Sequence, residues 1–185
     1  MMKRSFDILM SAVAILLLSP VLLFIAIGVK LQDGGPSLFG QQRVGKGGRV
    51  FRMWKFRSMV TNAERLGGYS TADRDPRITP LGRFIRRTSL DELPQLINVL
   101  TGDMSVVGPR PDVPAQSSLY TENEWQTRHI VRPGITGLAQ STLRSAATAE
   151  QRKALDLEYA QNASFGLDLR IILMTFKQVI FKGGN

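Results

Sequence analysis

The sequence predicts a mainly α-helical protein with one small β-hairpin, preceded by a helical segment that enters a membrane. Three observations carry this prediction. An almost unbroken apolar run covers residues 8–31, β-prone segments flank a glycine-rich turn at residues 45–48, and apolar residues recur at helical spacing in several later segments. The 185 residues suffice for one ordinary domain with its own core.

The apolar run at residues 8–31 is long enough to cross a bilayer core, which requires ~20 helical residues. No small-x-small cleavage pattern follows it before Lys30, and the basic, cysteine-free remainder is typical of a cytoplasmic protein. We therefore expect a retained membrane segment rather than a cleaved signal peptide.

Ser19 and Pro20 lie in the middle of that run and predict a break in the helix. Proline removes a backbone hydrogen bond and bends the helix, and the Ser19 hydroxyl could satisfy a freed backbone group. Lys3 and Arg4 precede the run and a basic chain follows it, while positive residues tend to stay cytoplasmic. A re-entrant helix-break-helix over residues 1–34 satisfies both flanks, with residues 35–185 forming a cytoplasmic domain. A kinked single span is the alternative.

The hairpin is predicted after a turn at residues 33–36, from strands at residues 38–44 and 49–53. The glycine-rich stretch between them could also suggest a phosphate-binding loop. It lacks the Gly-Lys-Ser/Thr ending and the following helix that such a loop needs, so we interpret it as a turn.

Four later segments have helical patterns. An amphipathic helix is predicted from Leu93 to about Thr101 and Gly102, and others over residues 122–131 and 148–162. The apolar tail at residues 167–181 has basic residues at intervals. It either packs in the core or lies in the membrane interface with its lysines directed to water, and we favour the interface.

Composition excludes several kinds of site. The chain has no cysteine and a single histidine, so disulfides, thiol nucleophiles, cysteine-ligated metals and multi-histidine metal sites are ruled out. Any metal must be held by carboxylates, which favours Mg²⁺ or a similar hard cation. We assign no role to the lone His129, because an isolated histidine is more often structural than catalytic.

The net charge of +9 is concentrated between residues 43 and 87, which hold twelve basic and three acidic residues. Such a concentration indicates an anionic partner, which could be nucleic acid, an anionic membrane surface or a phosphorylated substrate. Basic and aromatic residues alternate from Trp54 to Arg57, a pattern that suits either nucleic-acid stacking or an interfacial surface.

Asp91 and Glu92 form the candidate catalytic pair. Ser89 and Glu92 match the capping-box pattern, in which both side chains only satisfy backbone donors at a helix start. Pro94 is tolerated only in a first turn, so the two carboxylates should lie at a helix N-terminus, which keeps carboxylates ionised and attracts phosphate. One carboxylate could attack a phosphate while the other serves as a base.

Attack by a carboxylate on a phosphate needs cations to screen the repulsion, and three sources are available. Arg86 and Arg87 directly precede the pair, and a carboxylate-bound Mg²⁺ could join them. Arg110 lies between Pro109 and Pro111, which fix the backbone on both sides of it. An arginine fork held this way binds phosphate with little ordering cost.

Many ordered motifs together resemble one family. They are Lys3-Arg4-Ser5-Phe6-Asp7, Ser19-Pro20, Gln42-Arg43-Val44-Gly45, Lys55-Phe56-Arg57-Ser58-Met59, Asp75-Pro76-Arg77-Ile78-Thr79, Ser89-Leu90-Asp91-Glu92-Leu93-Pro94-Gln95, Gly102-Asp103-Met104-Ser105, Val107-Gly108-Pro109-Arg110-Pro111 and Pro133-Gly134-Ile135-Thr136-Gly137. On these motifs the chain resembles the small monotopic phosphoglycosyl transferases, the PglC-like bacterial sugar transferases, over nearly its whole length.

The resemblance implies a reaction at the cytoplasmic face of the bacterial inner membrane. A sugar phosphate passes from a UDP-sugar to polyprenyl (undecaprenyl) phosphate, giving a polyprenyl-diphosphate sugar and UMP, as the first membrane step of glycoconjugate assembly. Asp91 would form a covalent phospho-sugar intermediate and bind Mg²⁺, and Glu92 would assist the acceptor. No nucleic-acid partner is expected on this interpretation.

The resemblance also assigns roles outside the pair. Six residues would bind substrate: Lys55, Arg86, Pro109, Arg110, Pro111 and Arg144. Ser19 and Pro20 would form the membrane break. Family members commonly have Gly-Arg-Asn where this chain has Leu143-Arg144-Ser145.

Two other classes of function compete with this one. The basic segment and its aromatic residues could belong to a membrane-tethered module that binds nucleic acid or anionic lipid. A structural subunit without turnover is a third class.

Overall fold

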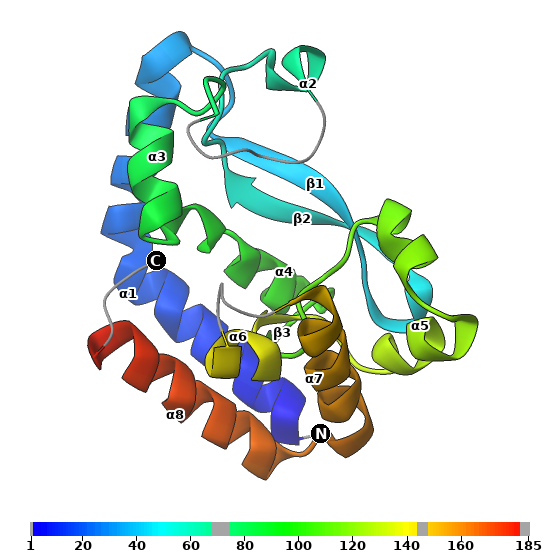
Figure 1. Cartoon of the computed structure of the whole chain (residues 1–185). Coiled ribbons are helices and arrows are strands. Elements are labelled where there is room, and N and C mark those ends of the chain that lie inside the picture. The colour runs from blue at the N-terminus through cyan, green and yellow to red at the C-terminus, as the bar shows by residue number, and fades with distance from the viewer. Residues whose placement is uncertain (1, 68–74, 144–147, 182–185) are drawn as a thin grey trace.

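The computed structural model describes residues 2–67, 75–143 and 148–181, and it is mainly helical as predicted (Figure 1). The helices are α1 (Met2–Asp33), α2 (Ala63–Leu66), α3 (Pro80–Arg87), α4 (Gln95–Thr101), α5 (Glu122–Arg128), α6 (Leu138–Leu143), α7 (Ala149–Asn162) and α8 (Phe165–Phe181). The strands are β1 (Leu38–Val44), β2 (Val50–Phe56), β3 (Ser105–Val107) and β4 (Gly134–Thr136). Short 3₁₀ turns cover Lys46–Gly48, Leu90–Glu92 and Pro114–Leu119.

Helix α1 contains the predicted membrane segment and is long and apolar enough to cross a bilayer. Only 11% of its most apolar stretch is buried against the rest of the chain. A core helix of a soluble domain would be mostly covered, so α1 is compatible with membrane anchoring.

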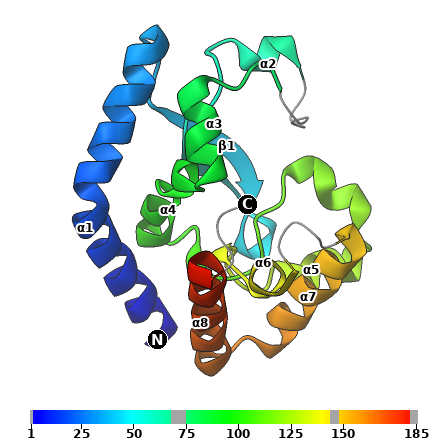
Figure 2. The same cartoon turned by 60° about the vertical axis from the view of Figure 1, so that its left-hand side comes forward.

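Pro20 lies inside α1, and the helix continues through it. The Ser19 hydroxyl donates to the Leu16 carbonyl at 2.8 Å. That carbonyl is the one that the missing Pro20 N–H would have served, so the predicted satisfaction of a freed backbone group by Ser19 is confirmed. Figure 2 shows α1 bowed along its length. The predicted break therefore takes the form of a bend within one continuous helix, and the re-entrant path stays a prediction.

Polar residues at the N-terminal end of α1 bind the body of the protein. Lys3 forms an ion pair of 2.6 Å with Asp168 on α8. Arg4 donates to the Val99 carbonyl at 2.6 Å, and the Asp7 carboxylate accepts from the Ser105 hydroxyl at 3.0 Å. Asp7 is buried to 2% exposure, so this end of α1 is fixed to β3, α4 and α8 rather than left in solvent.

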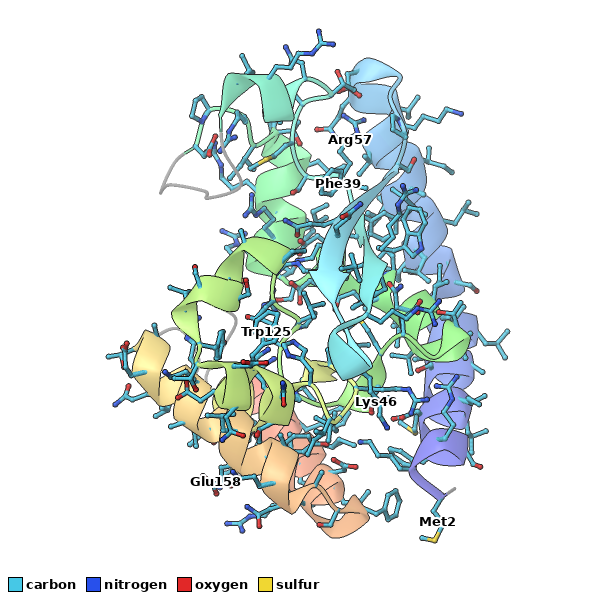
Figure 3. The ribbon with its side chains drawn as sticks, turned by 90° about the vertical axis from the view of Figure 1, so that its right-hand side faces the viewer. Met2, Phe39, Lys46, Arg57, Trp125 and Glu158 are labelled. Carbon is cyan, nitrogen blue, oxygen red and sulfur yellow. The ribbon has the colours of Figure 1, made fainter. Side chains whose placement is uncertain are left out.

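The C-terminal end of α1 is fixed as well. The Arg57 guanidinium binds both carboxylate oxygens of Asp33, at 2.5 and 2.6 Å, and also donates to the Pro36 carbonyl at 2.7 Å. Figure 3 labels Arg57 near this end of α1 and Met2 at the opposite end of the molecule. Both ends of a 32-residue helix therefore contact the same folded body.

The predicted hairpin is confirmed. Strands β1 and β2 pair antiparallel, from Leu38 opposite Phe56 to Val44 opposite Val50. Gly47 and Gly48 in the turn have φ of +67° and +76°, which favour glycine. Strand β2 continues to Phe56, beyond the predicted end, and so includes Lys55.

A parallel pair, β3 with β4, was not predicted from the sequence. Its strands have three residues each, too few to show a period. Beyond β3 the backbone of Gly108 approaches that of Gly134 so closely that a Cβ on Gly134 would lie 2.0 Å from the Gly108 nitrogen. This contact places the Pro109-Arg110-Pro111 loop directly beside β4.

Most predicted helices are confirmed with small shifts in their ends. Helix α4 ends at Gly102, whose φ of +94° is a glycine C-cap, and Thr148 caps the first turn of α7. Helix α3 was missed, although Pro80 at its start and the Thr79 side chain, which accepts from the Gly82 amide at 2.9 Å, are ordinary start signals.

Three clusters of buried side chains join the elements. Ile25 and Val29 of α1 pack on Phe56 and Ile85, so α1 shares a core with the hairpin and α3. The second cluster joins the hairpin to α4 and Met104, and the third joins β3, α7 and α8 through Val107, Tyr159 and Ile171. Residues before position 34 thus pack directly on residues after it. The domain boundary at residue 34 stays a prediction.

Helix α8 has one buried and one exposed apolar face. Ile171 is fully buried, while Leu169, Leu173 and Phe176 are 40%, 68% and 58% exposed. The core and interface alternatives for this segment therefore apply to different faces of the same helix. Its location in a membrane interface stays a prediction.

Candidate active site

Asp91 and Glu92 lie in the 3₁₀ turn Leu90–Glu92, just before α4. The predicted capping box is wrong, because Ser89 has a φ of +57° and its side chain makes no capping hydrogen bond. The Glu92 carboxylate is instead bound by side chains from distant segments. The pair consequently precedes α4 rather than forming its first turn.

Glu92 is the centre of a charged cluster. Its Oε1 accepts from Lys55 Nζ at 2.7 Å and from Arg110 Nη2 at 2.5 Å, and its Oε2 accepts from Arg110 Nη1 at 3.3 Å. Burial alone would raise the pKa of Glu92, but the charges of Arg110 and Lys55 and their hydrogen bonds outweigh it and lower the pKa to about 2. Glu92 is therefore an ionised, fully paired carboxylate.

Asp91 has the opposite environment. It is 8% exposed, and no hydrogen bond or ion pair among the described residues involves its carboxylate. Burial, opposed by the charge of Lys55 and assisted by that of Glu92, raises the pKa of Asp91 to about 6. Two adjacent carboxylates with pKa values pushed apart are suited to different chemical roles.

Lys55 reaches Glu92 because α4 is bonded to strand β2. The Asn98 side chain accepts from the Trp54 amide at 2.9 Å and donates to the Arg52 carbonyl at 2.8 Å. The Asn98 side chain thus satisfies backbone groups of β2 with which a neighbouring strand would otherwise pair. Burial lowers the pKa of Lys55, against the opposing charge of Glu92.

The pair opens into a cavity of about 690 Å³. Its basic lining residues are Lys55, Arg86, Arg87, Arg110 and Arg152. Thr136, Gln140, Thr175 and Gln178 add polar groups from β4, α6 and α8. An anionic ligand that fits this cavity would contact cations on several sides.

The structure brings together most of the predicted site. Lys55, Arg86, Asp91, Glu92 and Arg110 line one cavity. Pro109 and Pro111, on either side of Arg110, are buried and are not among the described residues that line the cavity. Arg144 lies outside the described residues.

Sequence reasoning missed the contributions of α6, α7 and α8 to the cavity. Gln140, Arg152, Thr175 and Gln178 belong to segments far from the pair in sequence and match no motif that we identified. Helix α8 was considered for core packing and for membrane contact. Its helical period offered no signal that one face would reach the catalytic cavity.

Several cations of the basic segment at residues 43–87 bind partners within the protein. Lys55 binds Glu92, Arg57 binds Asp33, and Arg77 binds Asp75 at 2.6 Å. Arg43 donates to the Pro111 carbonyl at 2.8 Å. Other basic residues of this segment are exposed and can still contact an anionic partner: Lys46, Arg49, Arg52, Arg65, Arg83 and Arg87.

The carboxylates of this site could bind Mg²⁺ only together with phosphate groups of a substrate. No group of three or more acidic or histidine side chains among the described residues could hold a metal ion. Mg²⁺ is commonly bound by one or two carboxylates together with substrate phosphates. Asp91, whose carboxylate has no hydrogen-bond partner among the described residues, can supply that carboxylate.

A second cavity, of about 410 Å³, lies between the end of α1 and the start of α3. Its one carboxylate, Asp33, is paired with Arg57. This cavity therefore carries no candidate chemistry.

A free carboxylate beside a paired one, in a cavity lined by cations, is suited to phosphoryl-group chemistry. The chain belongs to the bacterial sugar transferase family, whose model matches residues 1–182. The resemblance drawn from the motifs is thereby confirmed at the level of the family.

Curated relatives agree with this family. The UDP-glucose:undecaprenyl-phosphate glucose-1-phosphate transferase of Escherichia coli (strain K12) is 44% identical over 99% of this chain, and the undecaprenyl-phosphate glucose phosphotransferase of Komagataeibacter xylinus is 46% identical over 97%. The match covers only 40% and 36% of these two proteins. The exopolysaccharide production protein PSS of Rhizobium leguminosarum bv. phaseoli is 47% identical, with 98% of this chain and 96% of the relative covered.

Proposed function

We propose that this protein is a polyprenyl-phosphate phosphoglycosyl transferase. It transfers a sugar phosphate from a UDP-sugar to undecaprenyl phosphate, yielding undecaprenyl-diphosphate sugar and UMP. The observation that carries the proposal is the contrast between an unpaired Asp91 and a Glu92 held by Lys55 and Arg110 in one cationic cavity. The names of the Escherichia coli and Komagataeibacter xylinus relatives support the substrate classes.

In the first half-reaction a carboxylate oxygen of Asp91 attacks the phosphorus that bears the sugar. The bond from that phosphorus to the UMP oxygen breaks, UMP leaves, and the phospho-sugar is joined to Asp91. In the second, a phosphate oxygen of undecaprenyl phosphate attacks the same phosphorus and the Asp91 carboxylate is released. Splitting the transfer in this way replaces one difficult displacement by two easier ones.

Four side chains assist these steps. Arg110 and Lys55 supply positive charge beside Glu92, and the charge of Arg86 acts on Asp91. Glu92 assists the acceptor phosphate by holding Lys55 and Arg110 in place. A Mg²⁺ ion held by Asp91 and the substrate diphosphate would neutralise charge on the transferring phosphate and the leaving UMP.

The direct test uses purified protein in lipid nanodiscs with undecaprenyl phosphate, Mg²⁺ and a panel of UDP-sugars. We expect UMP release with at least one donor, and loss of release when EDTA removes the metal. Radiolabelled donor added without acceptor should leave label on the protein. Absence of UMP release with every donor contradicts the proposed function, whereas release without protein label contradicts only the covalent step.

We also propose that α1 enters and leaves the cytoplasmic leaflet of the inner membrane. Lys3, Arg4 and Asp7 at one end of α1 and Asp33 at the other all bind the same body, which supports placing both ends on one side. A single span would put one set of these partners across the bilayer. The exposed apolar residues of α1 and of the outer face of α8 provide the lipid contact.

Cysteine labelling tests this topology, since the native chain has no cysteine. Met2→Cys, at a position 71% exposed, should resist a membrane-impermeant maleimide added outside intact spheroplasts and react after permeabilisation. Lys46→Cys in the hairpin turn is the matched control for the cytoplasmic side. Labelling of Met2→Cys from outside, with Lys46→Cys protected, would establish a single span instead.

A further inference from the structure

The loop that carries Arg110 is held at four successive carbonyl groups, those of residues 109–112. Each accepts a hydrogen bond of 2.7–2.9 Å from a different donor. In order the donors are the Gly134 amide, the Arg128 side chain, the Arg43 side chain and the Val44 amide. A loop without regular secondary structure is thereby fixed along its whole backbone.

Arg128 makes the most extensive of these contacts. It is the last residue of α5 and is 4% exposed. One guanidinium nitrogen donates to the Asp112 carboxylate, and the other donates to the Arg110 carbonyl and to Asp156 Oδ2, each at 2.7 Å. Asp112 follows the loop and Asp156 is on α7, so a single side chain joins the loop, α5 and α7.

The three acceptors of Arg128 require a planar fork. A lysine ammonium carries all its donors on one nitrogen, so it cannot reproduce the planar, widely spaced donors of a guanidinium. Buried ion pairs of this kind add little net stability over a well-packed apolar cluster, so stability alone does not account for the arrangement. What the arrangement supplies is a fixed backbone at Arg110.

Arg110 needs such support because its own side chain is 46% exposed. It reaches across to Glu92 with two nitrogens and faces the cavity. An exposed arginine on a mobile loop would lose conformational entropy each time it bound a ligand. With the backbone fixed in advance, its fork meets an incoming diphosphate at little cost.

We propose that Arg128 is a positioning residue that acts through Arg110 on binding of the nucleotide diphosphate. The inference rests on the proposed function for the identity of the substrate. Arg128 itself does not line the cavity among the described residues, and its effect passes through the Arg110 carbonyl and through Asp112.

The test is a double-mutant cycle between Arg128→Lys and Arg110→Ala, with UMP release as the assay. Arg128→Lys should raise KM for the UDP-sugar about tenfold, with a smaller change in kcat and no change in KM for undecaprenyl phosphate. In the Arg110→Ala background the same substitution should have almost no further effect. Lys153→Met is the control, because it breaks the neighbouring Lys153–Glu124 ion pair between α7 and α5 without touching the loop.

Three outcomes would overturn the inference: an unchanged KM, an equal loss in the Arg110→Ala background, or an equal loss in Lys153→Met. If Arg128→Lys fails to fold, Asp112→Asn carries the same comparison with a smaller expected rise in KM, because Asp112 pairs with Arg128 and is not among the described residues that line the cavity. Binding of UDP to the folded variants, measured by calorimetry, is the second readout. It should weaken in Arg128→Lys even if the wild-type protein releases no UMP, which separates failure of this inference from failure of the proposed function.

Discussion

Replacing Asp91 by asparagine is expected to abolish UMP release and, at the same time, to stabilise the folded protein. An amide of the same shape cannot attack phosphorus, and loss of a nucleophile lowers turnover by about a thousandfold or more. The neighbouring Glu92–Arg110 and Glu92–Lys55 contacts do not involve Asp91 and should persist.

The gain in stability follows from the pKa of Asp91. Its pKa is raised in the folded chain to about 6, so ionisation of Asp91 opposes folding. The penalty is absent below about pH 4, grows as pH rises towards 6 and is complete above it. Asp91→Asn removes the penalty, and its free energy of unfolding at pH 8 should exceed that of the wild type by up to about 3 kcal/mol.

Denaturant unfolding at pH 4 and pH 8 in the presence of EDTA measures this difference, and UMP release measures the activity. Wild-type turnover by Asp91→Asn would contradict its role as nucleophile. A lower stability at pH 8, with turnover lost, would indicate that the carboxylate is held by a favourable contact rather than strained by burial.

Glu92→Gln is expected to have the opposite effect on stability. The pKa of Glu92 is lowered to about 2, because Arg110 and Lys55 together outweigh the cost of its burial. Ionised Glu92 therefore stabilises the folded chain above about pH 4.5, and this contribution is lost as pH falls towards 2. At pH 7 the free energy of unfolding of the glutamine variant should be lower by about 3 kcal/mol, since Lys55 and Arg110 are left without their carboxylate.

Glu92→Gln should slow the second half-reaction and leave the first one intact. Asp91 remains available for attack, so label from a radioactive UDP-sugar should still accumulate on the protein. Transfer of that label to undecaprenyl phosphate should fall by about a hundredfold, because Lys55 and Arg110 lose the carboxylate that positions them. Unlabelled Glu92→Gln protein that retains its fold would place Glu92 in the first half-reaction instead.

Asp91→Asn and Glu92→Gln are matched controls for each other. Each variant removes one carboxylate charge, and the two positions are adjacent. A general effect of charge on this basic chain would change the free energy of unfolding of both variants in the same direction. Changes in opposite directions at pH 7 would arise only from the different partners of the two side chains. The comparison thus tests the cluster formed by Lys55, Glu92 and Arg110 independently of any assay of turnover.

Local patterns in the sequence predicted the hairpin, the helices α4, α5, α7 and α8, and the apolar helix α1 with its Ser19 and Pro20 bend. These features depend on period, turn residues and residue type within short windows. The parallel pair β3 and β4 escaped prediction because pairing between three-residue strands is a property of two distant segments. The capping box at Ser89 was wrong because long-range partners of Glu92 outcompeted a local backbone contact.

The sequence by itself indicated the type of chemistry through adjacent carboxylates, a proline-flanked arginine and a long apolar helix, all recognisable as motifs. Only the tertiary structure decided which carboxylate is free and which is paired. Lys55 and Arg110 are separated from Glu92 by 37 and 18 positions and reach it from β2 and from the loop after β3. A pKa depends on burial and on charges nearby in space, and these arise only when the chain has folded.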